Sequence, residues 1–282
     1  MNKRQSTHMF IASLLISGII FFQMAIYVIS MLAGWDVKFN LVEVCHSTLK
    51  MIGLSSLEYA LDGLVIFTLV YLFWKVCIQF VQAKRMKLKF QQYKEKNLTK
   101  NLNESFSNEK EEFIVISYPT PLAITMGFFT PKIVISTGLV NILTEEELNA
   151  VLAHEMYHKN NRDPLKMFML SLFSTTIRYI PILKWFHQKY RIVQEVLADE
   201  YAIERQATSA SLSSALLKML KVGKIDRMPF TYASFADTSV NYRIEYLLNP
   251  LTEVKLQIPW RDTVLSIAIF TLICSFFIYA LA

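Results

Sequence analysis

Long uncharged runs dominate the hydrophobic pattern of this chain near its two ends. Met9 to Leu32 is a stretch of 24 residues without a charged side chain, and Thr263 to Ala282 is another of 20. About 20 residues of helix span the hydrocarbon core of a bilayer, so each stretch predicts a transmembrane helix. The first is too long for the apolar part of a signal peptide and lacks a small-residue cleavage pattern, so we expect it to be retained.

A third apolar run, at about 57–83, contains charged residues. Glu58 and Asp62 stand at its start, and Lys75 stands within it. Because a lysine can extend its ammonium group along a helix toward the interface, we still predict a transmembrane helix here.

Between these runs the pattern changes to short strands and shorter helices. Phe113–Ser117 and Ile133–Ser136 predict strands, since both are short and rich in β-branched residues. A helix is expected to begin after Thr144, which forms a capping box with Glu147. It should end near Asn160, ahead of the sequence Asp163-Pro164.

Composition and charge agree with a membrane protein. The chain is 53% hydrophobic and 18% charged, whereas typical soluble domains are about 25% charged. Residues 84–100 hold seven basic side chains and one acid, and residues 33–59 hold two basic side chains and three acids. Basic residues favour the cytoplasmic side, so the N-terminus is expected inside the cell and the C-terminus outside. The basic stretch predicts contact with anionic lipid and no direct binding of nucleic acid.

The predicted helix carries the sequence His154-Glu155-Met156-Tyr157-His158. The two histidines lie one turn apart on one face, so both imidazoles can ligate a single Zn²⁺ ion. Glu155 points about 100° around the helix, where it can hold a water molecule as a general base. The alternative is a pair of exposed histidines on a solvated face, but this motif rarely arises by chance in a chain with five histidines.

A catalytic zinc ion needs a third protein ligand and an open position. The metzincin pattern is excluded, because Asn161 and Pro164 stand where it requires glycine and histidine. The alternative is a carboxylate from a later helix, and Glu195 and Asp199, again four residues apart, provide two. One of them can ligate the ion while the other supports a ligand.

The stretch between the two motifs must return to its starting side. Met167 to Ile177 is apolar, but a single crossing of the membrane would separate Glu195 from His154. We therefore expect a membrane-associated hairpin at about 165–186 that turns near Pro181. Upstream, we predict that an extended peptide substrate adds to a strand edge formed by Ala123, Ile124, Thr125, Met126 and Gly127.

Together these motifs resemble the bacterial membrane metalloprotease family that contains the β-lactam receptors BlaR and MecR. The likeness covers about residues 84–262 and rests on Thr125–Lys132, Glu146–His158, Asn161–Leu165, Glu195–Asp199 and Tyr242-Arg243-Ile244. The related HtpX-type membrane proteases share the core pattern. In the receptors a penicillin-binding sensor follows the last span, whereas this sequence ends at Ala282, so β-lactam sensing is not expected.

The resemblance implies a gluzincin-like protease with one zinc ion on His154, His158 and Glu195. It also implies that Glu155 is the base and that Asp199 supports a ligand. An additional oxyanion donor is expected, and the candidates are Tyr157, Tyr242 and Arg243. Arg243 is equally suited to a structural pairing with an acid such as Asp199.

The expected fold is an α-rich membrane protein, with transmembrane helices and an α+β zinc metalloprotease domain that contains a small sheet. The membrane region should cover residues 1–83, the cytoplasmic protease domain 84–262 and the last span 263–282. We predict an endopeptidase that cleaves a protein or peptide substrate at the cytoplasmic face of the bilayer in regulatory proteolysis. The alternatives are an HtpX-like quality-control protease and a non-catalytic zinc-binding scaffold. Nothing in the pattern specifies an oligomeric state.

Overall fold

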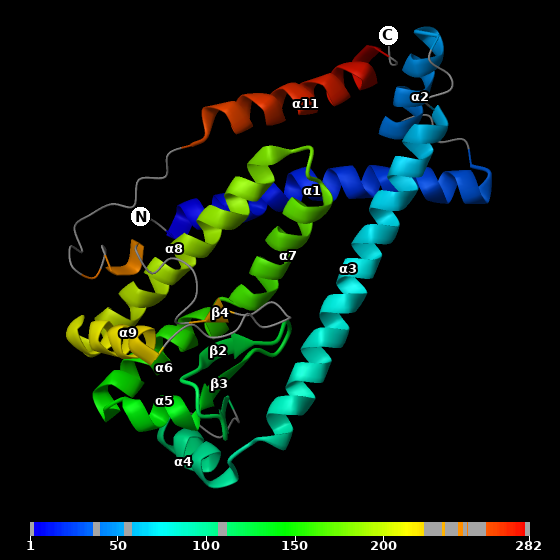
Figure 1. The fold of residues 1–282 in the computed structure, drawn as a ribbon. Coiled ribbons are helices and arrows are strands. Elements are labelled where there is room, and N and C mark those ends of the chain that lie inside the picture. The colour runs from blue at the N-terminus through cyan, green and yellow to red at the C-terminus, as the bar shows by residue number, and fades with distance from the viewer. Residues whose placement is uncertain are drawn as a thin grey trace. The chain divides into compact units, whose positions relative to one another are not determined.

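Helices form most of the chain, and a small sheet lies in its middle part (Figure 1). The structure, a computed structural model, describes residues 3–35, 40–53, 58–106, 112–222, 233–234, 242–244, 247 and 258–279. The elements in chain order are α1 (Lys3–Ala33), α2 (Leu41–Met51), α3 (Glu58–Gln92), α4 (Lys96–Phe106), β1 (Phe113–Ile116), β2 (Ala123–Met126), β3 (Lys132–Ser136), α5 (Thr137–Ile142), α6 (Glu145–Asn160), α7 (Asp163–Thr176), α8 (Pro181–Gln206), α9 (Ala210–Val222), β4 (Ala233–Ser234) and α11 (Trp260–Tyr279).

The chain divides into two compact units, which are described separately. One unit comprises residues 1–6, 79–168 and 188–256, and the other comprises residues 7–78, 169–187 and 257–282. The first contains the sheet and is called the sheet unit below. The second contains most of the long apolar helices and is called the helical unit.

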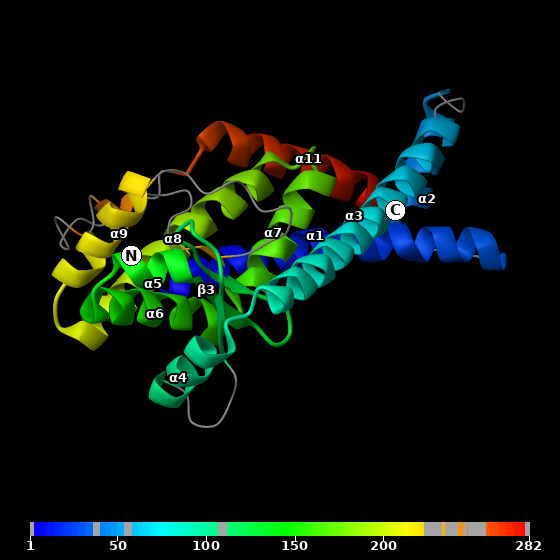
Figure 2. The same ribbon diagram turned by 60° about the horizontal axis from the view of Figure 1, so that its bottom comes forward.

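The sheet of the sheet unit has the strand order β1-β3-β2-β4. β1 is parallel to β3, whereas β2 is antiparallel to both β3 and β4. Both faces are covered, because successive side chains point to opposite faces and nearly all residues of β1, β2 and β3 are buried. One face packs against α6 and α9, and the other packs against Phe90 near the end of α3. In both Figure 1 and Figure 2, α5 and α6 lie beside the strands.

The helix α6 begins and ends where the sequence predicts. Thr144 accepts a hydrogen bond from the backbone N–H of Glu147, and the Glu147 carboxylate accepts one from the backbone N–H of Thr144, so the capping box is confirmed. After Asn160 the chain reverses through Arg162, whose φ of 53° lies in the left-handed region. This tight bend places Asp163 at the start of α7, five residues after His158.

In the helical unit, α1 and the first part of α3 pack around an apolar cluster with the end of α7 and the start of α8. The cluster contains Met24, Val65, Phe173, Ile177 and Leu183. Within the described residues, two helices are long and apolar enough to cross a membrane, Arg4–Ala33 and Tyr59–Gln92. Both overlap the predicted spans, and α3 continues past the expected end at residue 83. The predicted third span overlaps α11, while its last three residues lie outside the described part.

Candidate metal centre

The two histidines of the motif face one point inside the sheet unit. His154 and His158 are both fully buried on α6, and their Nε2 atoms lie 3.2 Å apart. The carboxylate of Glu195, from α8, lies 3.5 Å from His154 Nε2 and 3.6 Å from His158 Nε2. Among the described residues, these three form the one group of histidine, cysteine and acidic side chains close enough to share a metal ion.

The spacing of these atoms fits a tetrahedral zinc ion. Zinc–nitrogen bonds of about 2.0–2.1 Å at tetrahedral angles would separate the two nitrogens by about 3.3 Å. The observed separation of 3.2 Å agrees with this value. Two imidazoles and one carboxylate are also the donor set of many catalytic zinc sites, which leave one position open. The residues therefore fit a divalent metal ion.

Each imidazole is held by its own carboxylate. His154 Nδ1 lies 2.8 Å from Asp199 Oδ1, and His158 Nδ1 lies 2.8 Å from Asp163 Oδ2. For His158 this contact is a hydrogen bond, and in a neutral imidazole a proton on Nδ1 leaves the lone pair on Nε2, which is the atom that a metal needs. Asp199 thus lies where the sequence predicts a supporting group. Asp163 is a second supporting group that the sequence analysis did not identify, although it stands only five residues after His158.

The carboxylates give the site a strongly negative field. Burial alone would lower the pKa of His158, but its hydrogen bond with Asp163 and the charge of Glu195 raise that pKa to about 9. Burial alone would raise the pKa values of Glu195 and Asp199, yet the adjacent imidazole and guanidinium groups lower both. Both carboxyl groups are therefore ionised at neutral pH, which favours a bound cation.

Arg243 lies with the carboxylates of α8. Its Nε and Nη2 atoms donate to the two oxygens of Asp199 at 2.7 and 2.6 Å, and its Nη1 donates to Glu195 Oε2 at 3.4 Å. The guanidinium is fully buried, and a fork of this kind fixes the plane of the carboxylate. The pairing of Arg243 with Asp199 that we weighed from sequence is thus present.

Glu155 lies against β2, which packs on α6. Thr125 Oγ1 lies 2.7 Å from Glu155 Oε2 and 3.0 Å from the Glu155 backbone oxygen. Glu155 Oε1 is buried and has no hydrogen-bond partner among the described residues. Burial raises the pKa of Glu155, and this effect outweighs the nearby imidazoles, which lower it. A raised pKa brings a carboxylate closer to the range of a useful general base.

The two tyrosine candidates lie in different environments. Tyr157 is buried beside the ring of His158, with the ring centres 6.0 Å apart, and burial raises the pKa of its hydroxyl. Tyr242 is exposed, and the ammonium group of Lys189 lies 5.6 Å from the centre of its ring. Neither forms a hydrogen bond with His154, His158 or Glu195 within the described part of the chain.

The candidate substrate strand forms β2, except for Gly127. One edge of β2 pairs with β3 along its whole length, and at the other edge Thr125 pairs with Ala233 of β4. Gly127 has a φ of 108°, and an added Cβ atom would lie 3.0 Å from the backbone oxygen of Thr130. Glycine is therefore required for the turn into β3, and part of the predicted substrate edge is covered by the chain itself.

Sequence comparisons show which known proteins this chain is similar to. Over 73 residues the chain is 37% identical to Protease HtpX homolog 2 of Methanosarcina acetivorans and 36% identical to the Protease HtpX homolog of Moorella thermoacetica. The matches cover 25% of this chain, and 25% and 24% of the two relatives, so the chain matches about a quarter of the length of each. A model of the BlaR1 peptidase M56 family matches residues 22–247.

These matches and the two long apolar helices support a membrane metalloprotease. The family match spans both the apolar helix α3 and the histidine motif on α6, and it continues through Arg243. The chain therefore belongs to the BlaR1 peptidase M56 family.

Proposed function

We propose that this protein is a zinc-dependent endopeptidase whose metal ligands are His154, His158 and Glu195. The observation that carries the proposal is the meeting of both Nε2 atoms and the Glu195 carboxylate, with each imidazole oriented by its own aspartate. A solvated helix face would not bury all three side chains. When bound there, zinc would polarise the scissile carbonyl and lower the pKa of water.

In this mechanism Glu155 moves the proton. Its Oε1 atom accepts a proton from the attacking water, whose oxygen forms a bond to the carbonyl carbon of the substrate. The same proton then passes to the amide nitrogen as the carbon–nitrogen bond breaks, and the carboxylic acid and amine that result exchange a proton to give a carboxylate and an ammonium group. Thr125 holds Glu155 Oε2 during both transfers, so that Oε1 stays directed at the reacting atoms. Tyr157 and Tyr242 remain candidates for the oxyanion donor.

The substrate is proposed to bind in an extended form along β2. Thr125 connects this strand to the base, so that backbone pairing at β2 would place a peptide beside Glu155. β4 already pairs with β2 at Ile124 and Thr125. A substrate would therefore pair with the part of this edge that β4 leaves open, or it would replace β4.

We further propose that residues 84–262 form a cytoplasmic protease domain and that 1–83 and 263–282 supply its membrane spans. The seven basic residues between 84 and 100 support this orientation. Regulatory proteolysis of a cytoplasmic protein is the role we favour, because the stretch Thr125–Lys132 resembles the receptor family. The similarity to HtpX homologues over 73 residues supports quality control of membrane proteins as the second candidate.

The activity is tested with the full chain purified in detergent. Zinc content and cleavage of casein are measured for the parent, for Glu155→Gln and for Glu146→Gln, which removes an exposed carboxylate on the same helix. We expect one zinc per chain in all three and a loss of at least about 100-fold in cleavage for Glu155→Gln alone. A folded protein without zinc would refute the proposal, as would full activity of Glu155→Gln.

The two roles differ in the products they leave. Membranes that contain the parent or Glu155→Gln are compared by mass spectrometry of the peptides released. A few substrates cut at single positions would support regulatory proteolysis, whereas cleavage of many unfolded proteins at many positions would support quality control.

A further inference from the structure

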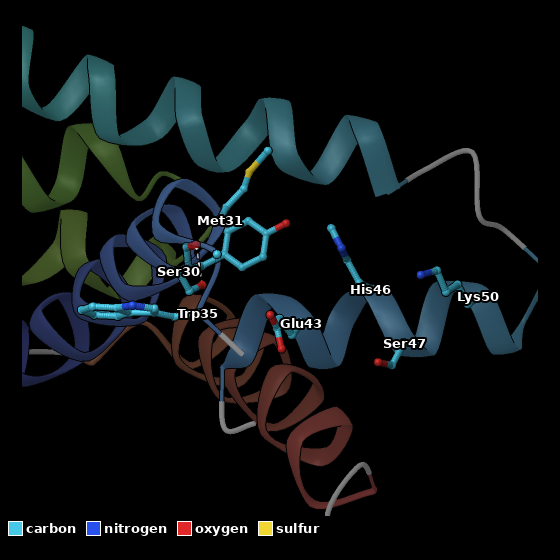
Figure 3. A pocket seen from close by; sticks show the side chains of 9 residues that line it. Ser30, Met31, Trp35, Glu43, His46, Ser47 and Lys50 are labelled. Atoms are coloured by element: carbon cyan, nitrogen blue, oxygen red, sulfur yellow. Dashed lines mark hydrogen bonds between the residues drawn. The ribbon is translucent and has the colours of Figure 1, made fainter. Parts of the chain in front are cut away.

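A cavity in the helical unit lies apart from the metal centre in the sequence. It has a volume of about 390 Å³ and lies between the end of α1 and the helix α2 (Figure 3). Its lining is Tyr27, Ser30, Met31, Gly34, Trp35, Glu43, His46, Ser47 and Lys50. The volume falls in the range of small-molecule sites, about 300–1,000 Å³.

Charge is ordered along the α2 side of this cavity. Glu43, His46 and Lys50 lie at positions i, i+3 and i+7, which share one face of a helix. The rise of about 1.5 Å per residue separates Glu43 from His46 by about 4.5 Å along the axis, and from Lys50 by about 10.5 Å. In Figure 3 the Glu43 carboxylate lies toward Trp35, and Lys50 lies beyond His46. Glu43 therefore places a negative charge at one end of the cavity, and Lys50 places a positive charge at the other.

The acidic end also carries an aromatic face. Trp35 lines the cavity with 65% of its surface exposed, and the face of an indole ring attracts cations. Glu43 forms no ion pair within the described residues, although it lies in the first turn of α2. An ammonium group would find both a negative charge and an aromatic ring at this end.

Contacts among Tyr27, His46 and Asp62 hold one side of the cavity in place. Asp62 of α3 accepts a hydrogen bond from the hydroxyl of Tyr27 at 2.5 Å, and its same oxygen lies 3.1 Å from His46 Nε2. The rings of Tyr27 and His46 meet edge to face, with their centres 5.6 Å apart. These contacts join α1, α2 and α3, so His46 is held in place before any ligand binds.

The position of the cavity favours a lipid over a water-soluble ligand. Its lining comes from the last turn of the apolar helix Arg4–Ala33 and the residues that follow it, and tryptophan at the end of such a helix is typical of the membrane interface. Met31, Met51 and Ile52 each expose more than half of their surface nearby in the sequence. Exposed apolar side chains beside a charged cavity suit a ligand that has both a headgroup and acyl chains.

We propose that this cavity binds the headgroup of a zwitterionic phospholipid. The ammonium group lies between Glu43 and Trp35, and the phosphate lies at the end formed by His46 and Lys50. The two charged groups of an ethanolamine headgroup are separated by two carbon atoms, which matches the single helical turn between Glu43 and His46. This site is independent of the proposed protease activity.

The test is native mass spectrometry of the full chain in detergent with added phosphatidylethanolamine or phosphatidylglycerol. We expect the parent to bind phosphatidylethanolamine about fivefold more tightly than phosphatidylglycerol, and Glu43→Gln to bring the two within about twofold. Lys50→Gln should weaken both lipids, since it removes a charge at the phosphate end. The control is Glu104→Gln, an exposed carboxylate of α4, which should leave the preference unchanged.

The ratio between the two lipids separates recognition from a structural effect, because a loosened α2 would weaken both lipids equally. An unchanged preference in Glu43→Gln would overturn the proposal, and so would a parent that prefers phosphatidylglycerol. Free phosphoethanolamine is the remaining probe. If it bound as tightly as the lipid, the cavity would be a site for a soluble zwitterion and the assignment to a phospholipid would be wrong.

Discussion

Replacing Asp163 by asparagine should weaken zinc binding without unfolding the protein. The carboxylate accepts a hydrogen bond from His158 Nδ1 at 2.8 Å and lies 3.4 Å from the hydroxyl of Tyr190, and both aspartate and imidazole are fully buried. Asparagine keeps the size of the side chain but removes its charge. It can also turn its amide group toward His158, which would favour the tautomer with a proton on Nε2, the atom that must ligate the metal.

The size of the effect follows from the role of such supporting groups. Loss of a partner that orients a metal-ligating histidine typically lowers metal affinity by about 10- to 100-fold. This factor corresponds to about 1.4–2.8 kcal/mol. The change concerns affinity alone, so excess zinc should restore cleavage by Asp163→Asn, whereas it should not restore cleavage by Glu155→Gln.

The assay is a competition titration of the detergent-purified chain against a chromophoric zinc chelator, with helix content checked by circular dichroism. Glu112→Gln is the matched control, because Glu112 forms an ion pair with Lys159 of the same helix but contacts neither histidine. The control should retain the zinc affinity of the parent within about twofold. If Asp163→Asn also stayed within twofold, or if both variants lost affinity equally, the argument that Asp163 orients His158 would be refuted.

Three further outcomes follow from the same structure. In the metal-free protein the pKa of His158 is about 9, so zinc must displace a proton, and a pH titration should show affinity rising by about tenfold per unit up to about pH 9. Burial alone would raise the pKa of Glu147, but its hydrogen bonds with Lys218 and Ser214 help to lower it to about 2. The ionised carboxylate therefore stabilises the fold fully above about pH 4.5, and this stabilisation is lost as pH falls toward 2. Thermal melts of Glu147→Gln should lack this loss. Gly138→Ala should lower the melting temperature, since the added Cβ would lie 2.0 Å from the Pro119 backbone oxygen.

The local elements could be predicted from sequence because neighbouring residues determine them. The capping box at Thr144 fixed the start of α6, and the predicted strands overlap β1 and β3. A return of the chain between α7 and α8 was predicted from a requirement of the site, because Glu195 has to reach the side of His154, and it stays a prediction. Whether these two helices contact the membrane remains a prediction.

The contacts that tune the site could not be read from spacing alone. Thr125 reaches Glu155 across 30 positions of sequence, because β2 packs against α6. Asp163 reaches His158 through the left-handed backbone of Arg162, a conformation that non-glycine residues seldom adopt. The pairing of β4 with β2 depends on a partner more than 100 residues later. In each case the contact depends on how the backbone bends or packs in three dimensions, which the sequence spacing does not show.

The charges around the two histidines explain why a cation belongs at this position. Asp163, Glu195 and Asp199 are buried together, and the guanidinium of Arg243 balances only one of the three negative charges. Without a metal, a proton on His158 supplies part of the missing positive charge, and this is why its pKa is raised. A divalent cation would displace this proton and balance the remaining two charges, and the Nε2 atoms of both histidines would then face it. Since buried charges are costly unless they are compensated, the same carboxylates that orient the imidazoles also make the metal-bound state the more stable one.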